Sequence, residues 1–443
     1  MSNAFLQIQG KKFNYDGKEI ILRGFGIGTW MNIEHFMIGL PGTEKKIRQT
    51  FADVYGKERS EEFFQSLLGA MITEDDFQFL KELGVNCIRL PFNYRHFEDD
   101  QKPGVYKSEG FRHLDRVLAL CGKYRIFAIL DLHAVPGAQN PDWHADSEFG
   151  VPVFWQDGSF RERVIGLWRF VADHFKDNPW VAGYDIINEP YLVADENVFR
   201  DFFKCVTGAV REVDRRHILF LEGEDWAKNF TLFDKPEDPQ TAYSFHLYPS
   251  HVMKDKKVES WRKKNLEEVL IPIIRAGEKF GRPLWCGETG AGFSRETMPL
   301  ALTMLHDMLD LLEGNNVSWT IWTYKDAQTM GLCYPRSDTQ WMKFVKEFKT
   351  DRNLFKKDHV IAEETISNLE KAHTGKIGDA LRHRVQFRLR GIFHHIFAEQ
   401  FLKPKLKTIP WEEMQEYPKS FLWENCGYWE EIAELVKSVI NNQ

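Results

Sequence analysis

Val181-Ala182-Gly183-Tyr184-Asp185-Ile186-Ile187-Asn188-Glu189-Pro190 has the form of a buried strand followed by its stop signal. The largely apolar run up to Asn188 is typical of a strand that is covered on both faces. Pro190 ends it, because proline has no backbone N–H to donate. The polar pair Asn188-Glu189 is therefore predicted to emerge at the carboxyl end of the strand, where parallel barrels carry their active sites.

Seven further apolar runs have the same form, and amphipathic stretches separate most of them. One such stretch begins at Thr73, which can cap a helix together with Asp76. Eight buried strands joined by helices predict an α/β fold, a (β/α)₈ TIM barrel. The other seven expected strands are Leu22–Gly28, Val85–Pro91, Ile126–His133, His217–Glu222, Thr241–Leu247, Pro283–Glu288 and Val317–Trp322.

Both ends of the chain add elements to this barrel. Before it, Phe5–Ile8 and Glu19–Leu22 predict a hairpin around a turn at Asp16-Gly17. The barrel is expected to close near Phe344. We therefore divide the chain into a catalytic barrel with its hairpin, residues 1–348, and a helical C-terminal extension packed on the barrel, residues 349–443.

The extension is expected to pack on the outside of the barrel and to contribute no catalytic group. Its apolar residues recur at helical spacing, which predicts amphipathic helices. The expected helices are Val360–Leu369, Ile377–Phe401 and Glu430–Ile440, with breaks at Pro404, Pro410 and Pro418.

Composition excludes several classes of function. A formal net charge of -7 argues against a nucleic-acid partner, which usually requires a basic face. No run of about 18 apolar residues is present, so no membrane-spanning segment is expected. The six cysteines are scattered singly, which favours neither zinc nor a disulfide framework. We expect a cytoplasmic protein, or a secreted one if a signal peptide has been removed.

Two carboxylates at strand ends are the strongest chemical signal. Glu189 follows one strand, and Glu288 ends another between Gly287 and Gly290, which let a ligand approach the backbone. Hydrolysis of a glycosidic bond needs two carboxyl groups that flank it. Glu222 also ends a strand and is the rival to Glu288, but it would lie off the axis that joins the other two.

The sequence resembles glycoside hydrolase family 5 from Leu22 to Lys325. The resemblance implies that Glu189 is the acid/base and that Glu288 is the nucleophile. It also implies that the remaining motif residues bind the substrate or hold the two carboxylates. The matching motifs are Ile88-Arg89-Leu90-Pro91, Asp131-Leu132-His133, Asn188-Glu189-Pro190, His246-Leu247-Tyr248, Gly287-Glu288 and the tryptophan Trp322.

Each of these residues has a physical role in this interpretation. Arg89 would keep Glu288 ionised, and Tyr248 would donate a hydrogen bond to it. Glu189 must be protonated, and the negative charge of Glu288 is expected to raise its pKa. His133 and Asn188 would hold sugar hydroxyls, and Trp322 would supply a flat floor for the ring.

A narrower resemblance points to the exo-β-1,3-glucanase branch of the family. Leu22–Trp30 and Asp131–Asn140 are similar to that branch, whereas Thr289 stands where the branch usually has tryptophan. The branch pattern implies that Glu34 contacts hydroxyls at the non-reducing end of the sugar. The loop from Ala134 to Trp155 would wall the same side, which predicts a pocket and not an open cleft.

The predicted function is retaining, double-displacement hydrolysis of a β-glucosidic bond, exo-acting on a β-glucan oligosaccharide or a simple glucoside. The expected partner is a carbohydrate or glycoconjugate. The alternatives are a glucolipid (ceramide or sterol) β-glucosidase, an endo-β-glucanase and a non-catalytic carbohydrate-binding barrel. A metal-dependent hydrolase is a further alternative. We expect no metal and no cofactor, because no two of the histidines share helical spacing with a carboxylate. The histidines concerned are His133, His144, His246 and His251.

Overall fold

The predicted barrel is confirmed by the computed structural model, which describes residues 4–193, 195–253 and 260–441. Eight parallel strands pair side by side in chain order, and the last of them pairs with the first to close the barrel. The strands are β4 Arg23–Gly26, β5 Cys87–Asn93, β8 Phe127–Ala134, β9 Val181–Asp185, β10 Ile218–Glu222, β11 Thr241–His246, β12 Leu284–Thr289 and β13 Ser318–Ile321.

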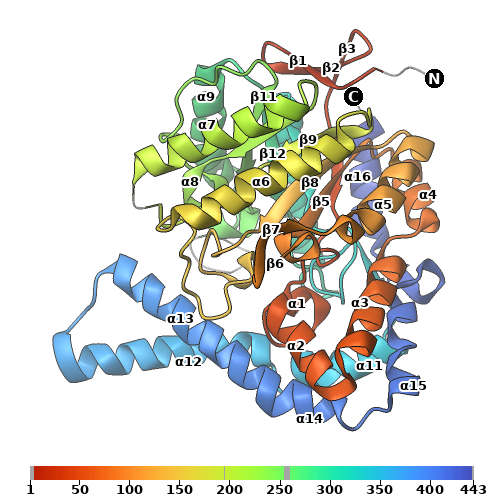
Figure 1. The fold of residues 1–443 in the computed structure, drawn as a ribbon, viewed down its shortest axis with the longest axis vertical. Helices are drawn as coiled ribbons and strands as arrows, with labels where there is room; N and C mark the ends of the chain where they lie inside the picture. Colours follow the sequence, from red (N-terminus) through yellow and green to blue (C-terminus); the bar gives the residue numbers. More distant parts are fainter. Residues whose placement is uncertain (1–3, 194, 254–259, 442–443) are drawn as a thin grey trace.

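Helices surround this barrel (Figure 1), and an apolar core fills the layer between helices and strands. The helices that follow successive strands are α4 Glu74–Glu82, α5 Phe111–Tyr124, α6 Gly158–Phe175, α7 Glu196–Val213, α9 Lys263–Phe280 and α10 Met298–Gly314. Shorter or inserted helices are α1 His35–Ile38, α2 Glu44–Tyr55, α3 Lys57–Met71, α8 Glu224–Ala227 and α11 Gln340–Lys346. At the start of α4 the backbone N–H of Thr73 donates to Asp76, which confirms the predicted capping pair.

The N-terminal segment differs from the expected hairpin. It forms three antiparallel strands, β1 Gln7–Gln9, β2 Lys12–Tyr15 and β3 Lys18–Ile20. The turn at Asp16-Gly17 is confirmed, but it joins β2 to β3, and β2 was not predicted. Phe13 on β2 packs against Phe220 in the barrel interior, with ring centroids 5.9 Å apart. The small sheet therefore closes the end of the barrel at which the strands begin.

The C-terminal residues are helical, as predicted. Their helices are α12 Leu354–Leu369, α13 Asp379–Phe397, α14 Lys403–Leu406, α15 Trp411–Met414 and α16 Glu430–Asn441. The predicted break at Pro404 is wrong. The chain stays helical from α13 through a π-helix, Ala398–Leu402, into α14, and Pro404 lies just after the π-helix, where the hydrogen-bond pattern changes.

The last helix returns to the barrel. α16 packs on α10, and Ile440 lies against Gly84 at the end of α4. The strand before it, β15 Cys426–Tyr428, pairs with β14 Cys333–Pro335. Between β14 and β15 the hairpin of α12 and α13 extends away from the barrel, at the end opposite the small sheet (Figure 1). Within the described residues, no helix is both long enough and apolar enough to cross a membrane.

Candidate active site

A pocket of about 630 Å³ opens at the carboxyl ends of the barrel strands. Glu189 and Glu288 both line it. One carboxylate oxygen of each lies within 4.8 Å of the other. This is a short separation: carboxyl groups about 5 to 5.5 Å apart suit attack by one of them on a sugar, whereas about 6.5 to 9.5 Å leaves room for a water between them.

Backbone strain marks the position of Glu189. It lies four residues after the end of β9 and has a φ of 48°, a conformation that side-chain-bearing residues rarely adopt. Its backbone N–H donates to Glu222 Oε2 at 2.6 Å, which holds the strained turn. Glu288, by contrast, belongs to β12 itself. The two carboxylates therefore come from the fourth and seventh barrel strands.

Arg89 is the buried cation at the centre of the site. Its guanidinium forms an ion pair with Glu288, and Nη2 donates to Asn188 Oδ1 at 2.8 Å. Three more carboxylates lie around it, namely Asp131, Asp185 and Glu222, at 3.2, 3.0 and 3.1 Å. Burial alone would lower the pKa of Arg89, but these carboxylates raise it well above its usual value. The guanidinium is thus permanently charged and lies behind Glu288, without lining the pocket itself.

A second cation connects the two carboxylates. His246 Nδ1 lies 2.9 Å from Glu189 Oε1 and 3.7 Å from Glu288 Oε2, and Nε2 lies 3.2 Å from Glu222. Burial would lower the pKa of His246, but Glu222 and Glu288 raise it well above its usual value. On the other side, the Tyr248 hydroxyl donates to Glu288 Oε2 at 2.6 Å. Glu288 is therefore held from two directions.

The pKa of Glu189 differs from the expected one. Burial raises it, but the hydrogen bond from His246 and the neighbouring charges of His144 and His133 lower it to about 2. The expected rise counted only the negative charge of Glu288. The free site therefore stores its proton on His246, next to the Glu189 carboxylate.

Trp322 and His133 form an aromatic wall of the pocket. Their rings are parallel, with centroids 5.3 Å apart. Trp322 lies directly on the first barrel strand, since a Cβ at Gly26 or Gly28 would approach its ring to 2.6 or 2.7 Å. The glycines of this segment therefore serve close packing of the tryptophan.

Most of the substrate-binding residues predicted from the sequence line the pocket. Those that do so are Glu34, His133, His246, Tyr248 and Trp322. Asn188 is buried behind them, and its Nδ2 has no hydrogen-bond partner among the described residues, so this donor is available to a ligand. Glu222 is fully buried, and both of its oxygens are engaged by Arg89 and by the Glu189 backbone.

Trp226 and Lys228 are among the lining residues that were not predicted. They follow β10, where Asp225, Trp226 and Ala227 all have positive φ. The ring of Trp226 stacks on Tyr191, with centroids 4.6 Å apart. A tryptophan in a strand-to-helix loop of a barrel was a usable signal, because these loops build the rim of the site.

One group of described residues has a spacing that could hold a metal ion. It consists of Glu189, His246 and Glu288, whose possible ligand atoms all lie within 4.8 Å of one another. The Glu288 carboxylate already faces the guanidinium of Arg89, and the Glu189 carboxylate already faces the imidazole of His246. A divalent cation would have to compete with both, so the arrangement suits carboxylate chemistry better than metal binding.

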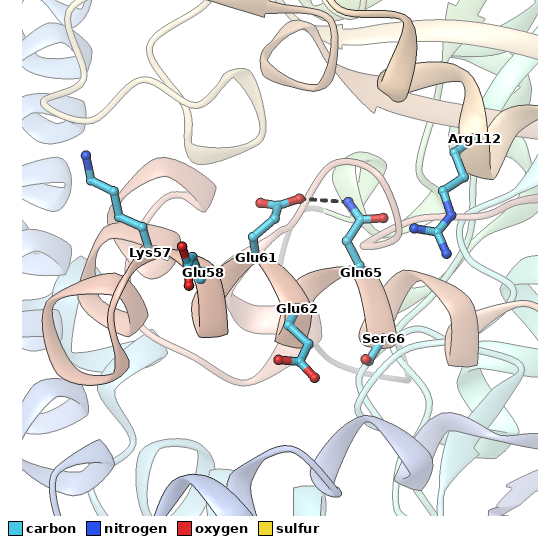
Figure 2. A pocket seen from close by; sticks show the side chains of 7 residues that line it. All are labelled: Lys57, Glu58, Glu61, Glu62, Gln65, Ser66 and Arg112. Carbon is cyan, nitrogen blue, oxygen red and sulfur yellow. Dashed lines mark hydrogen bonds between the residues drawn. The ribbon is translucent and has the colours of Figure 1, made fainter.

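A second hollow, of about 730 Å³, lies on the outside of α3. Figure 2 shows its side chains spread along α3, with Arg112 extending from α5 near Gln65, which donates to Glu61 at 2.8 Å. None of its seven lining residues is buried, so it lacks the enclosed polar groups of a specific site.

Comparison with known proteins agrees with this geometry. A family model described as cellulase (glycosyl hydrolase family 5) matches residues 52–328. A beta-xylosidase of Phanerodontia chrysosporium is 35% identical, covering 96% of this chain and 95% of that protein. A probable glucan 1,3-beta-glucosidase A of Emericella nidulans is 27% identical over 46% of this chain and 53% of its own length. The endoglucanase Cel5A of Thermotoga maritima shares the fold, with a TM-score of 0.52 and 18% identity over 70% of this chain and 91% of that one.

Proposed function

The chain belongs to glycosyl hydrolase family 5 and is a retaining β-glycosidase, and on that premise we propose that it removes single terminal sugars from a β-glucoside. The observation that carries the proposal is the position of Glu34. It lines the same pocket as the two carboxylates, and its pKa is raised well above the usual value by burial and by Glu288. A carboxyl group so close to the reacting pair suits the end of a single-sugar site.

We assign the two steps of the reaction to the two pocket carboxylates. Glu288 attacks the anomeric carbon while Glu189 takes up the proton that His246 holds in the free site and delivers it to the leaving oxygen, which gives a covalent glycosyl-enzyme. Glu189, now a carboxylate, then takes a proton from a water that attacks the same carbon and releases Glu288. Arg89 and Tyr248 stabilise the Glu288 carboxylate as it leaves.

A terminal xylose is the second candidate for the released sugar. It is supported by the 35% identity to the beta-xylosidase, which extends over 96% of this chain and so includes the helical extension. Glucose and xylose differ by the hydroxymethyl group at C5. Initial rates on paired aryl β-glucosides and aryl β-xylosides decide between them through the ratio of the two kcat/KM values.

Exo action predicts a slow fall in viscosity on a soluble β-glucan. Removal of terminal units shortens each chain by one sugar, so reducing sugar should accumulate long before the viscosity drops. Viscometry and a reducing-sugar assay on the same sample measure both. A rapid loss of viscosity with few reducing ends would mean internal cleavage, as by an endo-β-glucanase, and would contradict the proposal.

Replacement of His246 by asparagine should move the alkaline limb of the kcat/KM profile to lower pH. In the wild type, the pair of His246 and Glu189 keeps one proton up to the raised pKa of His246. Without the imidazole that proton must sit on the Glu189 carboxyl, a group that ordinarily titrates near pH 4.3. Activity that needs the proton is then lost at a lower pH.

The measurement is kcat/KM against pH on an aryl glycoside with a poor leaving group, for which acid assistance matters most. His251→Asn, at another histidine that lines the pocket, serves as the matched control. An alkaline limb that stays in place in His246→Asn would contradict the assignment of the shared proton.

A further inference from the structure

Glu34 is held by a residue from outside the barrel strands. Trp143 Nε1 donates to Glu34 Oε2 at 3.2 Å, and both side chains line the pocket. Trp143 belongs to the long loop between β8 and α6, in a short 3-10 turn, Trp143–Ala145. The direction of the Glu34 carboxylate therefore depends on where the loop places this indole.

The indole of Trp143 in turn rests on the C-terminal extension. The guanidinium carbon of Arg390, on α13, lies 4.2 Å from the centre of the Trp143 ring, which is cation–π distance. The ring of His35 meets another side of the indole, with centroids 4.5 Å apart. Arg390 is buried, although the residues before it on α13 are mostly exposed.

Arg390 is itself fixed in direction. Its Nε donates to Asp358 Oδ2 on α12 at 2.9 Å, and His394 Nε2 lies 3.1 Å from the same oxygen. Asp358 is fully buried. Burial raises its pKa, but His394 and Arg390 lower it to about 2, so the carboxylate stays charged and keeps the guanidinium in place. The two helices of the extension thus present one oriented cation to the loop.

The backbone of α13 also packs directly against the backbone of the loop between β8 and α6. A Cβ at Gly391 would lie 2.9 to 3.0 Å from backbone atoms of Phe149 and Gly150, and one at Gly150 would lie 2.4 Å from the Phe387 carbonyl. The ring of Phe387 also lies 5.9 Å from that of Trp226, another pocket residue. The loop and α13 are therefore in close contact along the segment that leads to Arg390.

We infer that Arg390 is a positioning residue of the active site: it fixes the indole of Trp143, which holds the Glu34 carboxylate against the terminal sugar. The inference rests on the proposed exo function. It makes the hairpin of α12 and α13 part of the substrate site, although none of its residues lines the pocket. It also gives this hairpin, which extends away from the barrel in Figure 1, a role besides packing.

Arg390→Met should raise KM for an aryl β-glycoside about tenfold and leave kcat within about threefold, since a wall contact stabilises bound substrate and transition state alike. Arg390→Lys keeps the charge and should recover part of the loss. Arg388→Met, the same substitution at an exposed residue two positions earlier on α13, is the matched control and should behave as wild type. Equal KM values for the Arg390→Met and Arg388→Met variants would overturn the inference.

A double-mutant cycle tests whether Arg390 acts through Trp143. Trp143→Phe removes the donor to Glu34, so adding Arg390→Met to it should cause little further loss. Independent, multiplicative effects would contradict the inference.

The crystal structures of the Arg390→Met and Arg390→Lys variants give a second test, which does not depend on activity. We expect Trp143 Nε1 to move beyond hydrogen-bond distance of Glu34 in the methionine variant, and to show a smaller but measurable shift in the lysine variant, which serves as the test if the methionine variant does not fold. An unmoved indole would overturn the inference, whereas failure of the wild type on every aryl glycoside would instead contradict the proposed function.

Discussion

Glu288→Ala is expected to lower kcat by roughly 10⁶-fold, the scale on which loss of a catalytic nucleophile acts in other hydrolases. Neither Glu189 nor Glu222 is placed to replace it, because Glu189 is the proposed acid on the leaving-group side and both oxygens of Glu222 are engaged by Arg89 and the Glu189 backbone. The fold should survive, since Arg89 keeps three carboxylate partners. A thermal unfolding curve checks this point.

Azide should restore turnover of an activated aryl β-glycoside by this variant. The small anion can enter the space left by the missing carboxylate and attack the anomeric carbon from the same side as Glu288 did. One displacement inverts the centre, so the product is the α-glycosyl azide, which NMR identifies. Glu296→Ala, at an exposed glutamate shortly after β12, is the matched control. A Glu288→Ala variant that stays active while Glu222→Ala is dead would mean that the nucleophile is misassigned.

The fold was predictable from the sequence because buried parallel strands are continuous apolar runs. Each predicted barrel strand overlaps the observed one, and the ends differ by at most three residues, as at β9, which ends at Asp185 and not at Asn188. The N-terminal segment failed for the opposite reason. Its strands are only three or four residues long and mostly not buried. The alternation of apolar and polar residues over Lys12–Tyr15 is therefore too short to predict a strand.

The site was predictable wherever a residue stands at the end of a strand. His133, His246 and Trp322 were found in this way, because strand ends of a closed barrel converge on one rim, whereas Glu34 and Tyr248 came from the family resemblance. The pKa of Glu189 was not predictable from strand ends alone. It depends on how far His246 and His144 lie from one carboxylate, and those distances come from separate loops and strands.

The contact that α13 makes with the active-site loop also could not be predicted from the sequence. Arg390 ends a basic run, Arg382–Arg390, of the kind that usually forms a solvated helix face, and Arg388 in that run is indeed exposed. Arg390 is buried because Trp143, almost 250 residues earlier, covers it. A contact of that sequence separation leaves no periodic signal in either segment, so only the three-dimensional arrangement reveals it.

Glu189→Ala should separate the two steps of the reaction by their dependence on the leaving group. A dinitrophenol leaves without a proton, so formation of the glycosyl-enzyme should be nearly as fast as in the wild type. An alkyl glycoside needs the proton, and its turnover should fall by about 10⁴-fold, the upper range for a lost general acid. The second step should be slow for both substrates, because no base is left to activate water.

The glycosyl-enzyme of this variant should therefore accumulate on the dinitrophenyl substrate. Stopped-flow absorbance should show a burst of about one equivalent of phenol per active site, and the mass of the protein should increase by one glycosyl residue. Azide should speed the slow phase, and here the product should be the β-glycosyl azide, since two displacements restore the configuration. A loss of equal size on the two substrates, without a burst, would show that Glu189 does not supply the proton. His246, which carries that proton in the free site, would then be the group to test as the acid.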